Sequence, residues 1–413
     1  MKNWSSCILL SVCWLASANV SVAQETGRPG SYELTLERAL DIARERAPAV
    51  LAASERIGEA RGQLIQASVL LRDNPVLDAG GGPRRGAART SRDIELGLGQ
   101  TFELGGKRSA RIDAARAGVE QSVSAADDVT RRILHEVGVS YLRARHVEER
   151  LKIAGEIKQL TNEISQVARR KYDAGDVGIL DVNLAELVFA RFQVEVRNIE
   201  AARDRAISDL RVLLGLEPDV EVVIRGNLLD RKRYELVGLL ESAPSRPDIM
   251  VIDAEIRQAE AEIRLGEARS WPDLGLRFGY MREEYADIYR GSLSLSLPLF
   301  DHGQGIEATG KAREASLRIE REAAENSTRA RVRSEYKAYQ TLIEAVEQFE
   351  SGIPQLEQTD KLARKSYEAG AIHLGELLSM QREFVQSRVT YADLLLNAAL
   401  AGIELEAEAG VLR

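Results

Sequence analysis

The sequence predicts a mostly helical protein with a small membrane-embedded β part, built from two copies of one structural unit. Three observations support this fold class. The 413 residues match themselves at a shift that falls from 199 to 195 positions. Apolar side chains recur at spacings of three and four over very long stretches, as they do in α-helices. Segments of about ten residues alternate apolar and polar side chains, which is typical of strands in transmembrane barrels.

Residues 1–23 have the features of a signal peptide: a lysine near the start, an apolar run over 8–16, and small residues before the expected cleavage. We expect the mature chain to begin at Gln24 and to work beyond the inner membrane. Both cysteines lie in this segment, so the mature chain would contain no disulfide and no thiolate metal site. Lipidation at Cys13 is not expected, because valine precedes it and is a poor residue at a lipoprotein cleavage position.

Two motifs define the repeat. Ala47-Pro48 corresponds to Arg246-Pro247, and Tyr172-x-x-Gly175 corresponds to Tyr367-x-x-Gly370. The first repeat, 24–215, is expected to contain a helix, strands at about 76–82 and 93–104, a long helix over 106–171, a tip turn over 172–181 and a return helix over 182–214. After an equatorial connector over 216–236, the second repeat, 237–413, contains a helix, strands at about 273–281 and 289–299, a long helix over 304–366, a tip turn over 367–376 and a return helix over 377–410.

The long helices are expected to pair with their return helices. No proline occurs between Pro83 and Pro218, so the first long helix can run uninterrupted for about 100 Å at about 1.5 Å per residue. Its apolar stripe and that of the return helix have the same spacing, which allows an antiparallel coiled coil. In the second repeat, Pro354 predicts a kink or a break within the long helix.

The strands carry the clearest functional signal. In 93–104 the apolar set Ile94, Leu96 and Leu98 alternates with charged residues and glycine, and 289–299 alternates leucine with serine in the same way. Four strands cannot close a barrel, because the smallest bacterial barrels have eight. Three copies would supply 3 × 4 = 12 strands and a helical tube of the same symmetry. Trp271 begins a strand where an interfacial aromatic belt would lie. The alternative is a half-buried soluble sheet.

The sequence resembles the outer-membrane efflux protein family, the TolC-like outer-membrane factors. The resemblance covers nearly the whole mature chain. It rests on the opening helix motif 36–40 with Pro48 after it, and on the repeated Tyr-x-x-Gly turn at Tyr172-Gly175 and Tyr367-Gly370. The family's usual Asn before that proline is Ala47 here. The segment 100–108, Gln-Thr-Phe-Glu-Leu-Gly-Gly-Lys-Arg, resembles the strand-to-helix junction of the heavy-metal branch, the cobalt-zinc-cadmium type exporters.

The resemblance implies a homotrimer in the cell outer membrane: a 12-stranded β-barrel continuous with an α-helical coiled-coil barrel that extends into the periplasm. The helical tips would dock onto a periplasmic adaptor, a membrane fusion protein, fed by an inner-membrane RND pump. The tip residues are Tyr172, Gly175, Tyr367 and Gly370, and the strand-to-helix junction residues are Gly105, Gly106, Lys107 and Gly303. The chain would be a passive conduit for heavy-metal cations. The alternative is a duct of the same fold for drugs or organic solutes, or for type I secretion. A periplasmic coiled-coil protein without a pore is an alternative of another class.

The resemblance also implies a periplasmic gate. Carboxylates just beyond the second tip turn narrow the closed mouth in this family, and the matching residue is Glu376. Its partner one turn further along is Ser379, which cannot form a second acidic ring. Asp181 is the repeat mate of Glu376, and Asp176 lies nearby. The alternative is that each carboxylate only complements the dipole at a helix start.

Other features exclude several functions. The net charge of −8 gives no support for nucleic-acid binding. Phosphate-loop and nucleophile-elbow motifs are missing, and the four histidines lack metal-ligand spacing, so we expect no enzyme, cofactor or bound metal. Four arginines, Arg84, Arg85, Arg89 and Arg92, are expected in the loop between the first two strands. They could contact lipopolysaccharide phosphates or be solvated loop charges.

Overall fold

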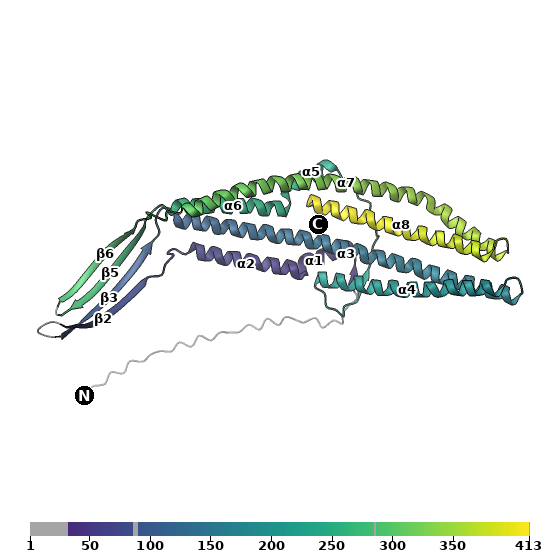
Figure 1. Ribbon diagram of the computed structural model, residues 1–413, viewed down its shortest axis with the longest axis horizontal. Helices are drawn as coiled ribbons and strands as arrows, with labels where there is room; N and C mark the ends of the chain where they lie inside the picture. The colour runs from purple at the N-terminus through teal and green to yellow at the C-terminus, as the bar shows by residue number, and fades with distance from the viewer. Residues whose placement is uncertain (1–31, 86–89, 285, 413) are drawn as a thin grey trace, which may run out of the picture.

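The computed structural model describes residues 32–85, 90–284 and 286–412. The expected signal peptide, 1–23, and Arg89 lie outside the described residues. The molecule is long and thin (Figure 1). Its helices run along the long axis, four strands form one end, and the two helix–helix turns form the other end (Figure 1). The β part and the helical tips therefore lie at opposite ends of the molecule.

The two repeats give the same order of elements. The first contains α1 (Leu36–Arg46), α2 (Pro48–Ser68), α3 (Lys107–Asp173) and α4 (Ile179–Leu214). The second contains α5 (Leu236–Ser242), a 3-10 turn (Ala243–Ser245), α6 (Pro247–Ala268), α7 (Gln304–Glu368) and α8 (Leu374–Ala409). Proline is the first residue of both α2 and α6, where its fixed φ favours a helix start and its missing N–H costs no hydrogen bond. The repeat signal Pro48 and Pro247 thus marks two equivalent helix starts.

Pro354 lies inside α7 and does not break it. A proline in a helix removes one backbone hydrogen bond and bends the axis. Buried contacts hold α7 on both sides of that point, with Val346 before it and Ala363 after it. The helix continues because this packing offsets the lost bond, and α7 follows a curved path past α8 (Figure 1).

The large sheet joins the two repeats. Its strands are β2 (Val76–Arg85), β3 (Thr90–Phe102), β5 (Asp273–Glu283) and β6 (Ala286–Ser296), all antiparallel and in the order β2-β3-β5-β6. The central β3–β5 pair therefore ties the first repeat to the second. A separate parallel pair of three-residue strands, β1 (Tyr32–Leu34) and β4 (Val222–Ile224), lies near the middle of the molecule. The sequence did not indicate this pair, because three residues are too few for a periodic signal.

The ends of β2 and β3 correct one sequence prediction. Arg84, Arg85 and Arg92 belong to strands and not to the connecting loop. Three consecutive glycines lie within β2 and pair with β3, since Gly80 lies opposite Glu95 and Gly82 opposite Asp93. A strand needs only the backbone groups of these residues, which glycine supplies as well as any residue.

The main core lies at the middle of the molecule. Tyr141 on α3 and Leu210 and Leu214 on α4 are completely or almost completely buried there against α1 and the β1–β4 pair. Each such buried leucine stabilises the fold by about 1.5–3 kcal/mol. Within 32–85, 90–284 and 286–412, no helix carries an apolar stretch long enough to cross a lipid bilayer.

Candidate functional site

The large sheet has one apolar face and one polar face. Paired residues share a face in an antiparallel sheet, so the register assigns each side chain. Exposed or half-buried apolar residues cover one face: Leu77, Leu96, Leu98, Leu274, Leu276, Phe278, Tyr280, Tyr289, Leu293 and Leu295. The other face carries charged and small residues: Asp78, Asp93, Glu95, Gly97, Gly99, Arg277, Gly279, Arg290, Ser292 and Ser294. The alternation predicted from the sequence is therefore present in the structure.

The polar face is organised by ion pairs that cross whole strands. Asp78 on β2 and Arg277 on β5 are 3.2 Å apart, although β3 lies between their strands. They can meet because Gly97 and Gly99 of β3 place no side chain between them. Near the loops, Arg84 pairs with Asp93 at 2.8 Å and with Glu283 at 2.9 Å.

The sheet is incomplete as it stands. Its outer strands, β2 and β6, pair on one side only within the described chain. Its apolar face is exposed, with Tyr289 at 81% and Leu293 at 70% of full exposure. Unpaired strand edges cannot remain in lipid, where no water satisfies the backbone groups. In a lipid bilayer, a sheet with this surface would need further strands at both edges.

The junction between strands and helices is built on glycines. Gly105 and Gly106 have φ of +70° and +77°, which disfavours other residues. A Cβ on Gly105 would lie 2.2 Å from the Trp271 ring, so the chain passes directly against that side chain. Lys107 then donates to Asp273 at 2.7 Å and ties the start of α3 to the start of β5. In the second repeat a Cβ on Gly303 would lie 2.1 Å from a backbone oxygen of α6.

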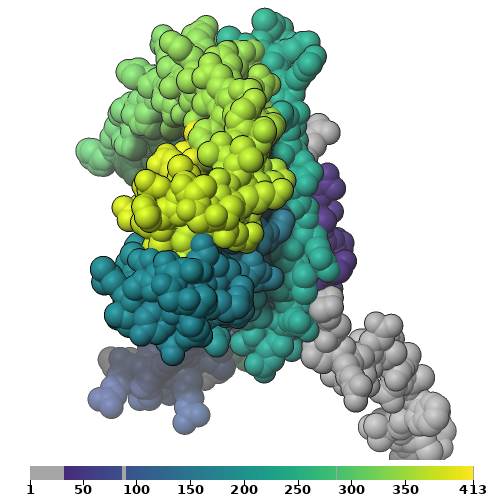
Figure 2. All heavy atoms as spheres, turned by 90° about the vertical axis from the view of Figure 1, so that its right-hand side faces the viewer, coloured from purple at the N-terminus to yellow at the C-terminus, as the bar shows by residue number. Residues whose placement is uncertain are grey.

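The opposite end of the molecule consists of two helix turns that pack on each other. Gly175 and Gly370 have φ of +84° and +77° and reverse the chain after α3 and α7. Lys171 Nζ donates to the Tyr367 carbonyl at 2.6 Å and lies 4.6 Å from the centre of its ring. Tyr367 is 3% exposed, whereas its repeat mate Tyr172 is 39% exposed. Figure 2 shows the α7–α8 tip in yellow-green against the α3–α4 tip in blue-teal.

The predicted acidic residues occupy two kinds of position. Glu376 is in the first turn of α8, and its carboxylate accepts from the backbone N–H of His373 at 3.4 Å, forming a capping box. Asp181 is in the first turn of α4, where no side chain caps the helix. Burial raises the pKa of the Tyr367 hydroxyl, and the nearby charge of Asp181 raises it further. Asp176 lies in the first tip turn, with its N–H bound to the Lys171 carbonyl at 2.8 Å.

Two further contacts join the two coiled coils along their length. His146 Nε2 on α3 lies 2.8 Å from Asp393 on α8, and Arg388 on α8 pairs with Glu156 on α3. Burial is the main cause that lowers the pKa of His146, and Asp393 opposes this shift. Sequence reasoning missed these residues, because partners more than 200 positions apart are set by the register between two hairpins.

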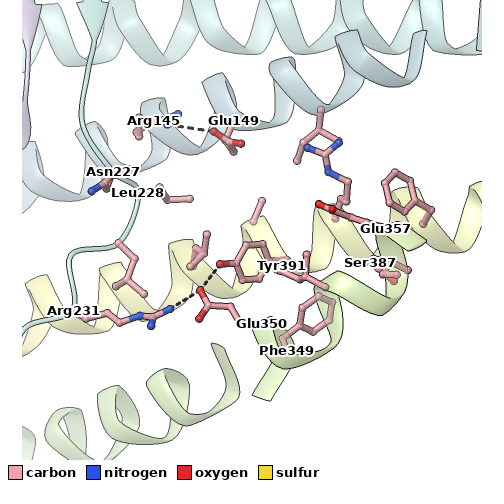
Figure 3. Close-up of a pocket in the computed structure, with 18 of the residues that line it drawn as sticks. Arg145, Glu149, Asn227, Leu228, Arg231, Phe349, Glu350, Glu357, Ser387 and Tyr391 are labelled. Carbon is pink, nitrogen blue, oxygen red and sulfur yellow. Dashed lines mark hydrogen bonds and ion pairs between the residues drawn. The ribbon is translucent and has the colours of Figure 1, made fainter. Parts of the chain in front are cut away.

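A cavity of about 650 Å³ lies where α7 curves past α8 (Figure 3). It is bounded by α3, the connector segment 227–231, α7 and α8. On its wall, Glu350 accepts from Arg231 and from Tyr391 (Figure 3). These two hydrogen bonds lower the pKa of Glu350, and burial together with Glu350 raises the pKa of Tyr391 to about 12. The polar groups on this wall satisfy one another and hold the connector against α7 and α8.

No three histidine, cysteine, aspartate or glutamate side chains come together as a metal site in the part of the chain that the structure describes. What the described residues offer is mechanical and electrostatic: a sheet with one apolar face, a rigid junction, and two long coiled coils joined at their far ends.

Comparison with known proteins gives a consistent result. The outer membrane efflux protein family model matches residues 39–216 and 240–411. The cobalt-zinc-cadmium resistance protein CzcC of Cupriavidus metallidurans is 28% identical, over 94% of each chain. Protein CyaE of Bordetella pertussis is 27% identical over 92% of this chain and 85% of its own, and the pyoverdine export outer membrane protein OpmQ of Pseudomonas putida is 24% identical over 90% and 84%. The crystal structure of CusC superposes with a TM-score of 0.77 at 19% identity, over 94% of this chain and 95% of that one.

A four-stranded sheet with one apolar face, continuous with long coiled coils, defines the TolC-like fold class. The chain belongs to the outer membrane efflux protein family. It is therefore an efflux channel of the outer membrane that extends into the periplasm, and it is not an enzyme. The fold and family predicted from the sequence are both confirmed.

Proposed function

We propose that three copies of this chain assemble into the exit channel of a tripartite efflux system and conduct heavy-metal cations from the periplasm to the exterior. The observation that carries the proposal is the open sheet, with two unpaired edges and an exposed apolar face. Three copies bring 3 × 4 = 12 strands, enough to close a barrel around the polar faces. The chain is a passive conduit, because the described residues of its polar face supply charge and small side chains that leave space.

The partners are a periplasmic adaptor of the membrane fusion type and an inner-membrane RND pump. Their docking site is the pair of tip turns, with Tyr172, Gly175, Tyr367 and Gly370. The exposed side chain of Tyr172 supports this site. So do apolar residues on the first turns of α4, with Leu180 75% and Leu187 66% exposed. An exposed apolar surface at the end of a periplasmic helix pair fits a protein partner.

The gate lies at the same end. Three copies of Glu376 around one axis would form a ring of like charges that repels itself and attracts cations. Asp181 and Asp176 are the further candidates. The capping box of Glu376 supports the alternative role as a helix cap, so its charge and its hydrogen bond have to be tested separately.

Heavy-metal cations are the proposed substrate because of the relative CzcC and the segment 100–108. Drugs or organic solutes are the rival, supported by the similarity to a pyoverdine export protein. A type I secretion duct would share this fold. Membership of an outer membrane efflux family argues against the alternative of a periplasmic coiled-coil protein without a pore.

The test is the growth of a deletion strain across divalent metals, antibiotics and detergents, with plasmid complementation. We expect sensitivity to cobalt, zinc or cadmium that the plasmid reverses, with drug tolerance unchanged. Drug sensitivity with normal metal tolerance would replace the substrate proposal by the organic-solute duct.

A further inference from the structure

The outer ends of the strands carry arginines on both faces of the sheet, and the two faces differ in how far acidic residues neutralise these arginines. On the polar face, Arg84 is neutralised by Asp93 and Glu283. On the apolar face the register places Arg85, Arg92 and Arg282, since Arg92 lies opposite Pro83 and Arg282 opposite Ile94. All three are exposed. Within the described residues, the only ion pair that these three arginines form joins Arg282 to Asp287 at 3.7 Å. The apolar face therefore carries a net positive charge at this end.

The three arginines form one diagonal row across three strands. Arg85 of β2 is two residues beyond Pro83, which pairs with Arg92 of β3. Arg92 in turn is two residues beyond Ile94, which pairs with Arg282 of β5. Diagonal neighbours in a sheet are about 7–8 Å apart, within joint reach of long side chains. The row can therefore surround one or two phosphate groups.

The position of this row relative to the bilayer follows from the aromatic residues. Tyr280 and Tyr289 pair on the apolar face one step below Arg282, and Trp271 lies two residues before the other end of β5, which begins at Asp273. From Trp271 to Tyr280 an extended chain spans about 30 Å at about 3.4 Å per residue. A tilt of about 40° reduces this to about 23 Å, close to the apolar band of about 25 Å in outer-membrane barrels. The arginines thus lie just beyond the band, at the headgroups of the outer leaflet.

We propose that Arg85, Arg92 and Arg282 form a binding site for the phosphate groups of lipid A in the outer leaflet. The proposal rests on the proposed function, because it needs the apolar face to meet lipid. Arginine binds phosphate through charge-assisted, often bidentate hydrogen bonds. The leucines below the row contact the acyl chains of the same molecule, and this combination selects a phosphorylated lipid over free phosphate.

The test measures binding of bisphosphorylated lipid A to the full chain in detergent by native mass spectrometry. The triple variant Arg85→Gln, Arg92→Gln, Arg282→Gln should bind at least tenfold more weakly, because each basic residue near an anionic headgroup contributes to the attraction. Arg290→Gln is the matched control, with the same change on the polar face of the same sheet, and should bind as the unchanged protein does. Arg282→Gln alone should bind lipid A about threefold more weakly. This single variant replaces the triple variant in the test if the triple variant does not fold.

Three outcomes would overturn the site: undiminished binding by the variants, equal binding of lipid A stripped of its phosphates, or full displacement of the lipid by millimolar inorganic phosphate. Conductance in planar bilayers, measured on the same preparations, tests the channel separately. A protein that binds lipid A and conducts no ions would refute the proposed function and leave the site standing.

Discussion

At the scale of single residues, Glu376 combines two roles that a pair of substitutions can separate. Glutamine at the third helix position can replace glutamate in a capping box but carries no charge. If Glu376 forms a charged gate, Glu376→Gln and Glu376→Ala should both weaken block of the closed channel by divalent cations, by about the same factor. If it is only a cap, the glutamine variant should behave as the unchanged protein. Single-channel recording with added divalent cations distinguishes the two.

The residue scale also shows why side-chain roles are hard to predict. Arg84 and Arg85 are adjacent in the sequence and both follow the same glycines, yet one faces the polar side and the other the apolar side of β2. Which residue takes which side depends on where the strand ends and on its register with β3. A shift by one residue would exchange them. The functions assigned to the tip and gate residues stay predictions.

At the scale of elements, the strands were predictable because their signal is local. The alternation of Leu96 and Leu98 with glycine and glutamate defines the faces without knowledge of any partner. The long helices were predictable for the same reason, from stripes repeated over many turns. The contact of His146 with Asp393 could not be predicted in this way, since it depends on the register between the two helical hairpins. The effect of Pro354 was also undecided, because the packing around a proline determines whether the helix continues.

Two neighbouring residues of β6 provide a test of which face meets lipid. Leu293 lies on the apolar face near the middle of the strand, and Ser292 lies on the polar face beside it. We expect Leu293→Arg to destabilise the folded channel by about 2–4 kcal/mol, because arginine is costly in the bilayer interior. Ser292→Arg should change stability little. Urea unfolding in lipid vesicles measures both, and equal effects would contradict the proposed orientation of the sheet.

At the scale of the whole molecule, the contact between α3 and α8 at His146 depends on pH. Burial holds the pKa of His146 below its usual value, so the packed form favours neutral histidine. As the pH falls below about 6.5, histidine protonates more readily where it is solvated, and the packing of α3 on α8 loses stability. At higher pH this penalty is absent.

Acidification should therefore increase the leak of the closed channel. We expect higher conductance at pH 5.5 than at pH 7.5 in the unchanged protein, and a much smaller difference in His146→Gln, which cannot titrate at this position. A pH response of the same size in the variant would show that another group is responsible.

The junction at Gly105 and Trp271 has a mechanical consequence. The helix α3 that starts there has 67 residues and is about 100 Å long. It acts as a lever, so a tilt of about 3° at its base would displace the far end by about 5 Å, the length of one helical turn. No atom larger than hydrogen fits on Gly105, and Lys107 is bound to Asp273. The start of α3 can therefore tilt very little. The rigid start of α3 therefore limits how far its distant end can move sideways.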